Sequence, residues 1–138
     1  MTLAPDDRPL PISDPATAPY WVAARAHRLS LPRCEDCGEL HFYPRPLCPH
    51  CGSQRLGWAD VSGDGEVFSF TIVQRAPSPA FADKVPYAVA IVALDEGPHL
   101  MSNIIGCPAD QVRIGLRVRV NFLDFNEETS LPVFEPAS

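Results

Sequence analysis

The stretch RCEDCGELHFYPRPLCPHCGS, residues 33–53, decides how the front half of this chain folds. It contains two C-x-x-C pairs separated by ten residues, and few of its other side chains are apolar enough to build a hydrophobic core. Two such turns that face each other bring four thiolates around one point, which is the tetrahedral site that zinc fills. The predicted metal ligands are Cys34, Cys37, Cys48 and Cys51.

Metal coordination is therefore expected to replace the missing core of this segment. Gly38 and Gly52 follow the two pairs and give each turn a permissive backbone. Four sulfur ligands leave no open position for water, so we expect structural zinc, whose binding energy, on the order of 10 kcal/mol, becomes folding energy. Iron with the same ligands stays open, whereas a redox-active C-x-x-C belongs in an α/β unit that the sequence does not predict. We expect His41 to be exposed on the spacer and His50 to be no ligand.

Composition bounds the class of protein. The chain has 138 residues, of which 46% are hydrophobic and 20% charged, as expected of a globular protein with one ordinary domain or two very small ones. Sixteen prolines exclude long helices over most of the chain. The formal net charge of −6 has the wrong sign for a protein that neutralises nucleic-acid phosphates, so we expect no nucleic-acid partner.

The sequence also bears on the compartment. No apolar run approaches the ~20 residues of a membrane span, and the first residues, MTLAPDDRPLPISDP, lack the basic-then-apolar layout of a secretory signal. We therefore expect a cytoplasmic protein without a membrane partner. Thiols stay reduced in the cytoplasm, so paired cysteines there favour a metal site over disulfides.

Proline positions and hydrophobic periodicity divide the chain into four parts. We expect a flexible N-terminal segment over residues 1–14, a short helix over 15–31, the zinc ribbon over 32–57 and a barrel over 58–138. Pro32 ends the predicted helix. A helix of about a dozen residues is marginal alone in water, so it must pack, either on the ribbon or on another protein. For the second case, the residues expected to contact a partner are Tyr20, Trp21, Arg25 and Arg28.

After the ribbon the hydrophobic pattern changes to that of strands. Residues 66–73 alternate so that Phe68, Phe70 and Ile72 are expected to face a core. Residues 86–94 are apolar on both faces, which is typical of a central strand or of a face that a neighbour covers. Further strands are expected over residues 99–106, 116–122 and 131–134. The expected fold is mainly β: a short N-terminal helix, a four-cysteine zinc ribbon, then a five-stranded OB-type barrel.

The sequence contains no motif for catalysis by this chain alone, such as a nucleophile with a base or a pair of carboxylates. Cys107 follows an apolar strand and is expected to be a small buried side chain. A coenzyme A site needs cations for the phosphates and a flat apolar surface for adenine. The candidates for such a site, which are otherwise surface residues around a connecting loop, are Arg75, Phe81, Lys84 and Tyr87.

The order of helix, four-cysteine ribbon and five-stranded barrel resembles the family of OB-fold proteins with a rubredoxin-like zinc ribbon that accompany thiolase-superfamily enzymes. The resemblance lies in LPRCEDCGELHFYPRPLCPHCGS, GEVFSFTIVQR, PYAVAIVALDEGP, DQVRIGLRVRVNF and LPVFEP, along most of the chain from Tyr20 onward. It implies a non-catalytic, obligate subunit of a thiolase, acyltransferase or retro-aldolase that acts on an acyl-CoA. It also implies a coenzyme A thioester shared with that partner, in the breakdown of lipids, steroids or aromatic compounds.

Two other functions compete with that of an accessory subunit. A module that binds single-stranded nucleic acid needs stacking aromatic residues beside a positive groove. The acidic net charge and the expected inward position of Phe68 and Phe70 count against such a module. The other competing function is a stand-alone carrier that binds coenzyme A. Co-purification with a thiolase-like protein would distinguish an accessory subunit from a nucleic-acid-binding module and from a stand-alone carrier.

Overall fold

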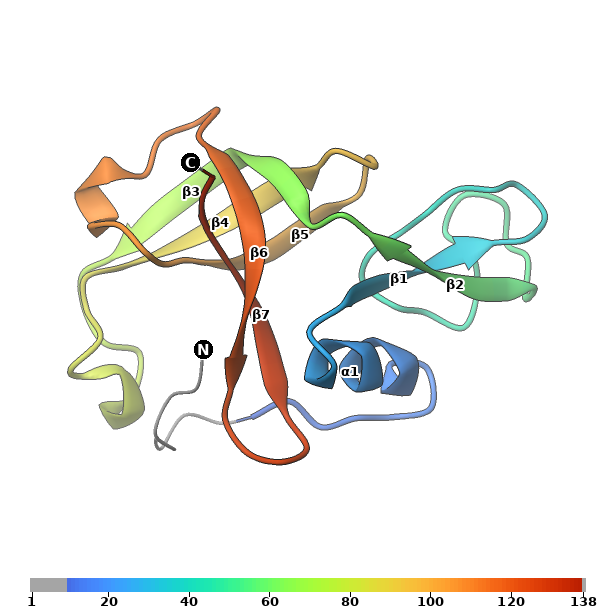
Figure 1. Ribbon diagram of the computed structural model, residues 1–138, viewed down its shortest axis with the longest axis horizontal. Helices are drawn as coiled ribbons and strands as arrows, with labels where there is room; N and C mark the ends of the chain where they lie inside the picture. Colours follow the sequence, from blue (N-terminus) through green and yellow to red (C-terminus); the bar gives the residue numbers. More distant parts are fainter. Residues whose placement is uncertain (1–9, 138) are drawn as a thin grey trace.

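In the computed structural model, which describes residues 10–137, a small ribbon with one helix stands beside a larger barrel (Figure 1). The helix α1 (Ala18–Arg25) and the strands β1 (Leu29–Cys34) and β2 (Leu56–Val61) come first along the chain. Residues 1–9 of the predicted flexible segment lie outside the described residues. No helix within residues 10–137 is long and apolar enough to cross a membrane.

The barrel contains the five strands that the sequence predicts, and it closes in the order β3-β4-β5-β7-β6. Its strands pair antiparallel except for β5 and β7, which meet in parallel at Ile104 and Phe134. The elements are β3 (Asp64–Val73), η1 (Pro79–Phe81), β4 (Tyr87–Leu94), β5 (His99–Ile104), η2 (Ala109–Gln111), β6 (Arg117–Asp124) and β7 (Ser130–Pro136). The mainly β fold with a closed barrel is therefore confirmed.

The hydrophobic core of the barrel continues into the ribbon and the helix. Strand alternation turns every second side chain inward, and Val92 and Phe134 are both 0% exposed. The same cluster of buried residues includes Leu29 and Leu31 from β1 and Tyr20 from α1. The ribbon therefore rests on the barrel through apolar contacts, in addition to any metal that it binds.

The expected inward position of Phe68 is wrong. The pairing of β3 with β4 skips this residue, which makes it the extra residue of a β-bulge. The bulge shifts the alternation by one position, so Val67 is 1% exposed whereas Phe68 is 56% exposed. Beyond the bulge, Phe70 and Ile72 pack against the core, as the sequence predicts.

The predicted helix over residues 15–31 is too long. Helix α1 ends at Arg25, and Leu29 and Leu31, which were expected in its last turn, belong to β1 instead. His27, with a φ of 60°, turns the chain between the two elements. As part of a strand the two leucines are 2% and 0% exposed, and β1 pairs along its whole length with β2. Strand β2 lies beyond the cysteines in sequence, so the local pattern could not reveal it.

The sequence left open whether the helix packs on this chain or on another protein. In the structure it packs on this chain. Helix α1 contacts β1 and β7. Tyr20 and Ala24 on its buried side are 4% and 1% exposed, whereas Val22 on its opposite side is 68% exposed. Burial against the ribbon and the barrel thus supplies the stability that a short helix lacks by itself.

A polar cluster, here called the clasp, fastens the end of α1 to the barrel. The Asp124 carboxylate on β6 accepts hydrogen bonds from His27 Nε2 at 2.7 Å, from Arg25 at 3.2 Å and from the Ser130 hydroxyl. Arg25 Nε also donates to the Glu127 carbonyl at 2.7 Å. The hydrogen bonds from Ser130 and His27 hold the pKa of Asp124 below its ordinary value.

The clasp predicts how the fold responds to acid. The pKa of an aspartate carboxyl group in the unfolded chain is about 3.9. When folding lowers this pKa, the carboxylate contributes its full stabilisation at pH values above about 3.9, and the contribution is lost as the pH falls through the pKa of the folded state. Asp124→Asn should therefore lower the free energy of unfolding between about pH 5 and 8, with the gap to wild type closing below about pH 4. Denaturant unfolding across this range measures the gap. Glu128→Gln, at an exposed position, is the control, and an Asp124→Asn gap that stays constant to low pH contradicts the clasp.

Candidate functional site

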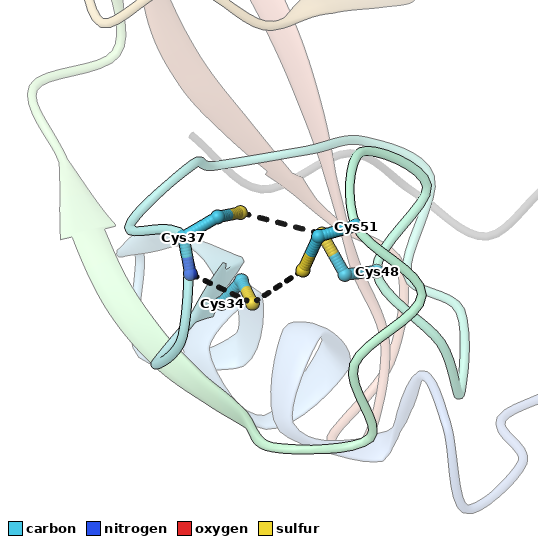
Figure 2. Close-up of side chains that lie close together, drawn as sticks. All are labelled: Cys34, Cys37, Cys48 and Cys51. Atoms are coloured by element: carbon cyan, nitrogen blue, oxygen red, sulfur yellow. Dashed lines mark hydrogen bonds between the residues drawn. The ribbon is translucent and has the colours of Figure 1, made fainter.

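The four predicted metal ligands come together at the end of the ribbon, and Figure 2 shows their sulfurs pointing toward one another. All four Sγ atoms lie within 4.8 Å of one another. Cys34 Sγ is 3.6 Å from Cys51 Sγ and Cys37 Sγ is 3.7 Å from Cys48 Sγ, so each contact joins one pair to the other. Zinc–sulfur bonds of about 2.3 Å in a tetrahedron place the sulfurs about 3.8 Å apart. The cluster therefore fits a zinc ion.

Two matching turns hold the sulfurs in this arrangement. In the first turn the Gly38 N–H donates to the Cys34 carbonyl at 2.9 Å, and in the second the Gly52 N–H donates to the Cys48 carbonyl at 2.9 Å. The two glycines have φ values of 77° and 80°. This left-handed backbone is strained for other residues, which explains why glycine follows each C-x-x-C pair.

The electrostatics of the cluster call for a cation. The Cys37 backbone N–H donates to Cys34 Sγ at 3.4 Å, and this hydrogen bond lowers the pKa of Cys34 to about 6. At Cys51 the Ser53 backbone N–H lowers the pKa, but the neighbouring Cys34 sulfur and burial outweigh it and raise the pKa to about 12. A divalent cation removes this competition between crowded sulfurs and lets all of them ionise. Four sulfur ligands leave no position for water, so zinc here is structural.

The expected exposure of His41 is wrong. Its side chain is 4% exposed, and neither ring nitrogen has a hydrogen-bond partner among the described residues. Burial, followed by the charges of Arg45 and His50, lowers the pKa of His41, so its imidazole is neutral at pH 7. His50 has an exposed side chain, and its backbone N–H donates to Cys48 Sγ at 3.3 Å. Neither imidazole belongs to the cysteine cluster.

Three of the four residues predicted to bind coenzyme A line one pocket of about 300 Å³. The rings of Phe81 and Tyr87 lie 5.7 Å apart between centroids, and Lys84 Nζ donates to the Ala80 carbonyl at 3.2 Å. Arg75 is exposed and is not among the residues that line this pocket. The other walls are Asn103, Ile104, Ile105, Leu123 and Val133.

The apolar walls of this pocket could not be predicted from the sequence. They come from β5 and the residue after it, from β6 and from β7, which only barrel closure brings together. The result is an apolar slot with one ammonium group in its lining. Such a slot can bury an apolar group and pair with an anionic one.

The residues predicted to contact a partner differ in how much surface they offer. Tyr20 is 4% exposed, and burial raises its pKa well above the ordinary value, so it belongs to the core. Arg25 is part of the clasp, and Arg28 donates to both carboxylate oxygens of Asp60, at 2.9 and 2.8 Å. Trp21 is half-buried, and its indole Nε1 has no hydrogen-bond acceptor among residues 10–137.

Known protein families match both parts of this architecture. Residues 21–57 match the ChsH2 rubredoxin-like zinc ribbon domain, and residues 58–123 match the ChsH2 C-terminal OB-fold domain. The chain is 39% identical over 130 residues to a probable enoyl-CoA hydratase alpha subunit of Thermomonospora curvata. It is also 35% identical over 103 residues to a DUF35 domain-containing scaffold protein of Methanothermobacter thermautotrophicus, covering 74% of this chain and 77% of that protein.

A solved structure described as the Ltp2-ChsH2(DUF35) aldolase has a TM-score of 0.84 and 38% identity, over 93% of this chain and 99% of that one. A four-cysteine ribbon followed by a closed five-stranded barrel defines the class of zinc-ribbon OB-fold proteins. Within that class, the chain belongs to the DUF35 family. The match covers 94% of this chain but 40% of the length of the Thermomonospora protein.

Proposed function

We propose that this chain is a non-catalytic accessory subunit that binds a thiolase-like enzyme and supports its carbon–carbon bond chemistry on an acyl-CoA. The observation that carries the proposal is the near-complete match to the DUF35 chain of a structure described as an aldolase, in which that chain is named together with Ltp2. The hydratase alpha subunit among the relatives supports acyl-CoA as the substrate class. The reaction of the partner is then thiolysis, acyl transfer or retro-aldol cleavage.

The ionisable groups support a role without catalysis by this chain. Where a carboxyl pKa is lowered outside the clasp, a guanidinium explains it: Arg28 lowers that of Asp60 and Arg117 that of Asp95. Arg117 donates to both oxygens of Asp95 at 2.9 Å, at the surface. Structural ion pairs shift pKa values in this way without any part in catalysis.

One group of side chains has the composition of a catalytic triad but not its order. Ser130, Asp124 and His27 lie together in the clasp. In a triad the histidine contacts the serine and takes its proton, while the carboxylate orients the histidine. Here the carboxylate stands between the other two, and the Ser130 residue is 0% exposed. The arrangement holds α1 on the barrel and does not activate a nucleophile.

We extend the proposal to the pocket that Phe81, Lys84 and Tyr87 line. In the complex this pocket holds part of the acyl-CoA that the chain shares with the enzyme. The apolar walls suit the pantetheine, adenine or acyl group, and the Lys84 ammonium suits a phosphate oxygen. Arg75 does not line the pocket, so the proposed contact with a phosphate rests on Lys84.

Lys84→Gln tests the role of the pocket. Loss of a charge-assisted hydrogen bond costs about 1.5–3 kcal/mol, so we expect the complex to bind acyl-CoA about tenfold or more weakly. Isothermal titration of the assembled complex with an acyl-CoA measures the affinity. Arg113→Gln removes an exposed charge outside the pocket and is the matched control. Equal affinity for wild type and Lys84→Gln contradicts the assignment.

Co-purification tests the accessory role itself. The tagged chain, expressed in its native cells, should carry one thiolase-like enzyme at a fixed stoichiometry through affinity and size-exclusion steps. Mass spectrometry identifies the companion, and light scattering gives the stoichiometry. A chain that emerges without an acyl-CoA enzyme, or that binds a single-stranded oligonucleotide tightly at ordinary salt, contradicts the proposal.

A further inference from the structure

Strand β4 is apolar on both of its sides, and one of these sides faces outward. Its inward residues, Ala88, Ala90, Val92 and Leu94, are all buried. Its outward residues, Tyr87, Val89, Ile91 and Ala93, are only half-buried. The solvated side of an antiparallel sheet is normally polar. The outer side of β4 instead has the composition of a surface that is covered in the working assembly.

Met101 of β5 and Phe68 of β3 extend this apolar side, whereas three of the β3 residues paired with the outward side of β4 are polar: Glu66, Ser69 and Thr71. The register places Met101 of β5 beside Ile91, and Ser69 of β3 on the other flank of Ile91. Met101 is 66% exposed, and the bulge turns Phe68 out onto the same side, beside His99 at 4.6 Å between ring centroids. A shallow hollow of about 170 Å³ opens here, and none of its lining residues is charged: Ser69, Phe70, Thr71, Val89, Ala90, Ile91 and Met101.

A second hollow, of about 220 Å³, adjoins the first at Met101. It lies between α1, the spacer of the ribbon, β5 and β7, and its lining residues include Trp21 and Tyr43. Tyr43 is 46% exposed. The other lining residues are Tyr20, Phe42, Leu100, Ser102, Asn103, Leu131, Pro132 and Val133, and none of them is charged. The second hollow is therefore uncharged and largely apolar, and Trp21 lines it although its Nε1 atom is itself buried.

We propose that the two hollows, together called the Met101 surface, form the docking site for the enzyme subunit; the identity of this partner rests on the proposed function. The lining of the two hollows calls for an apolar, uncharged partner segment. Phosphates and anionic lipids need Lys or Arg, which neither hollow contains. Aromatic residues and methionine are enriched at the centres of protein interfaces, from which charged residues are depleted.

A charge at the centre of the Met101 surface tests the proposal. Met101→Glu buries an unpaired carboxylate on docking and should weaken binding to the separately purified enzyme subunit about 100-fold or more. Ile114→Glu is the matched control, because Ile114 is 69% exposed and lines neither hollow. We expect its affinity to stay within about threefold of wild type. Tyr43→Ser, which probes the second hollow independently, should weaken binding about tenfold.

Titration calorimetry reports these affinities, and light scattering reports the state of each free chain. If wild type forms the complex and both Met101→Glu and Tyr43→Ser bind the enzyme subunit as tightly as wild type does, the docking site is wrong. The proposed function is not affected by that result. If the free wild-type chain dimerises and the Met101→Glu variant is monomeric, the Met101 surface binds a second copy of this chain. That result also overturns the proposal. Failure of the wild-type chain to bind any thiolase-like enzyme overturns the proposed function and this partner with it.

Discussion

Cys48→Ser is expected to abolish zinc binding and to unfold the ribbon. Cys48 is 3% exposed, and its Sγ lies 3.7 Å from Cys37 Sγ, so serine removes one of four converging ligands. A structural zinc site contributes on the order of 10 kcal/mol to folding, which exceeds the whole stability of many domains. Because Leu29 and Leu31 join the ribbon to the core of the barrel, the barrel should also melt at a lower temperature. Metal analysis and thermal unfolding measure the two effects.

The fifth cysteine is the control for this experiment. Cys107 is half-buried, lies outside the cluster and packs against the edge of the core. Cys107→Ser should keep about one zinc ion per chain and change the free energy of unfolding by about 1 kcal/mol. A Cys48→Ser chain that retained zinc and unfolded like wild type would show that the metal does not hold the ribbon.

Gly63→Ala is expected to disrupt the junction between the ribbon and the barrel. Gly63 lies between the end of β2 and the start of β3, with a φ of 82°. An added Cβ would stand 2.2 Å from Val120 Cγ1 and 2.9 Å from Val120 Cβ. Rotation of the valine cannot relieve the second contact, and the Val120 N–H holds the Gly63 carbonyl at 2.9 Å. Strain and overpacking together should lower the free energy of unfolding by about 3 kcal/mol or more.

Gly115→Ala separates the two causes. Gly115 has a similar φ of 87°, but an added Cβ there meets nothing within 4 Å. The backbone cost alone is about 1–2 kcal/mol, so Gly63→Ala should be clearly the more destabilising of the two. Urea unfolding gives both values. Equal losses would mean that Val120 and its strand move aside freely, and that the junction does not fix how the ribbon meets the barrel.

The parts of the fold that the sequence predicts correctly are those whose signal is local. The two C-x-x-C-G turns carry their own hydrogen bonds and backbone conformation, so the spacing of the cysteines was enough to predict the metal centre. The alternation of residues 116–122 was equally direct, because Val118 and Phe122 are buried while Arg117 and Arg119 are exposed. Each of these features lies within a few residues of chain.

The errors share a different cause, since each depends on a distant partner. Leu29 and Leu31 fall inside the segment predicted to be helical, and only pairing with β2 makes them strand residues. Phe68 fits the alternation of its strand, and only the register against β4 reveals the bulge. His41 is polar and lies on a short spacer, yet it is buried in the folded chain. Periodicity reports the preference of a segment, whereas these positions are decided by tertiary contacts.

The candidate sites differ in the same way: a site built from nearby residues was predictable, and a site built from distant strands was not. The metal ligands were predictable as a set, whereas the coenzyme A candidates gave one side of a pocket whose apolar walls come from three other strands. The doubly apolar segment 86–94 indicated part of the Met101 surface. Its second hollow could not be predicted, because Trp21, Tyr43 and β7 come together only in the folded chain.

Turnover of an acyl-CoA by the separated and recombined subunits tests the accessory role most directly. This chain alone should give no turnover, and adding it to the purified thiolase-like enzyme should restore activity that saturates at a fixed ratio of the two. A chain that consumes a thioester unaided, or an enzyme whose rate is indifferent to it, would contradict the account.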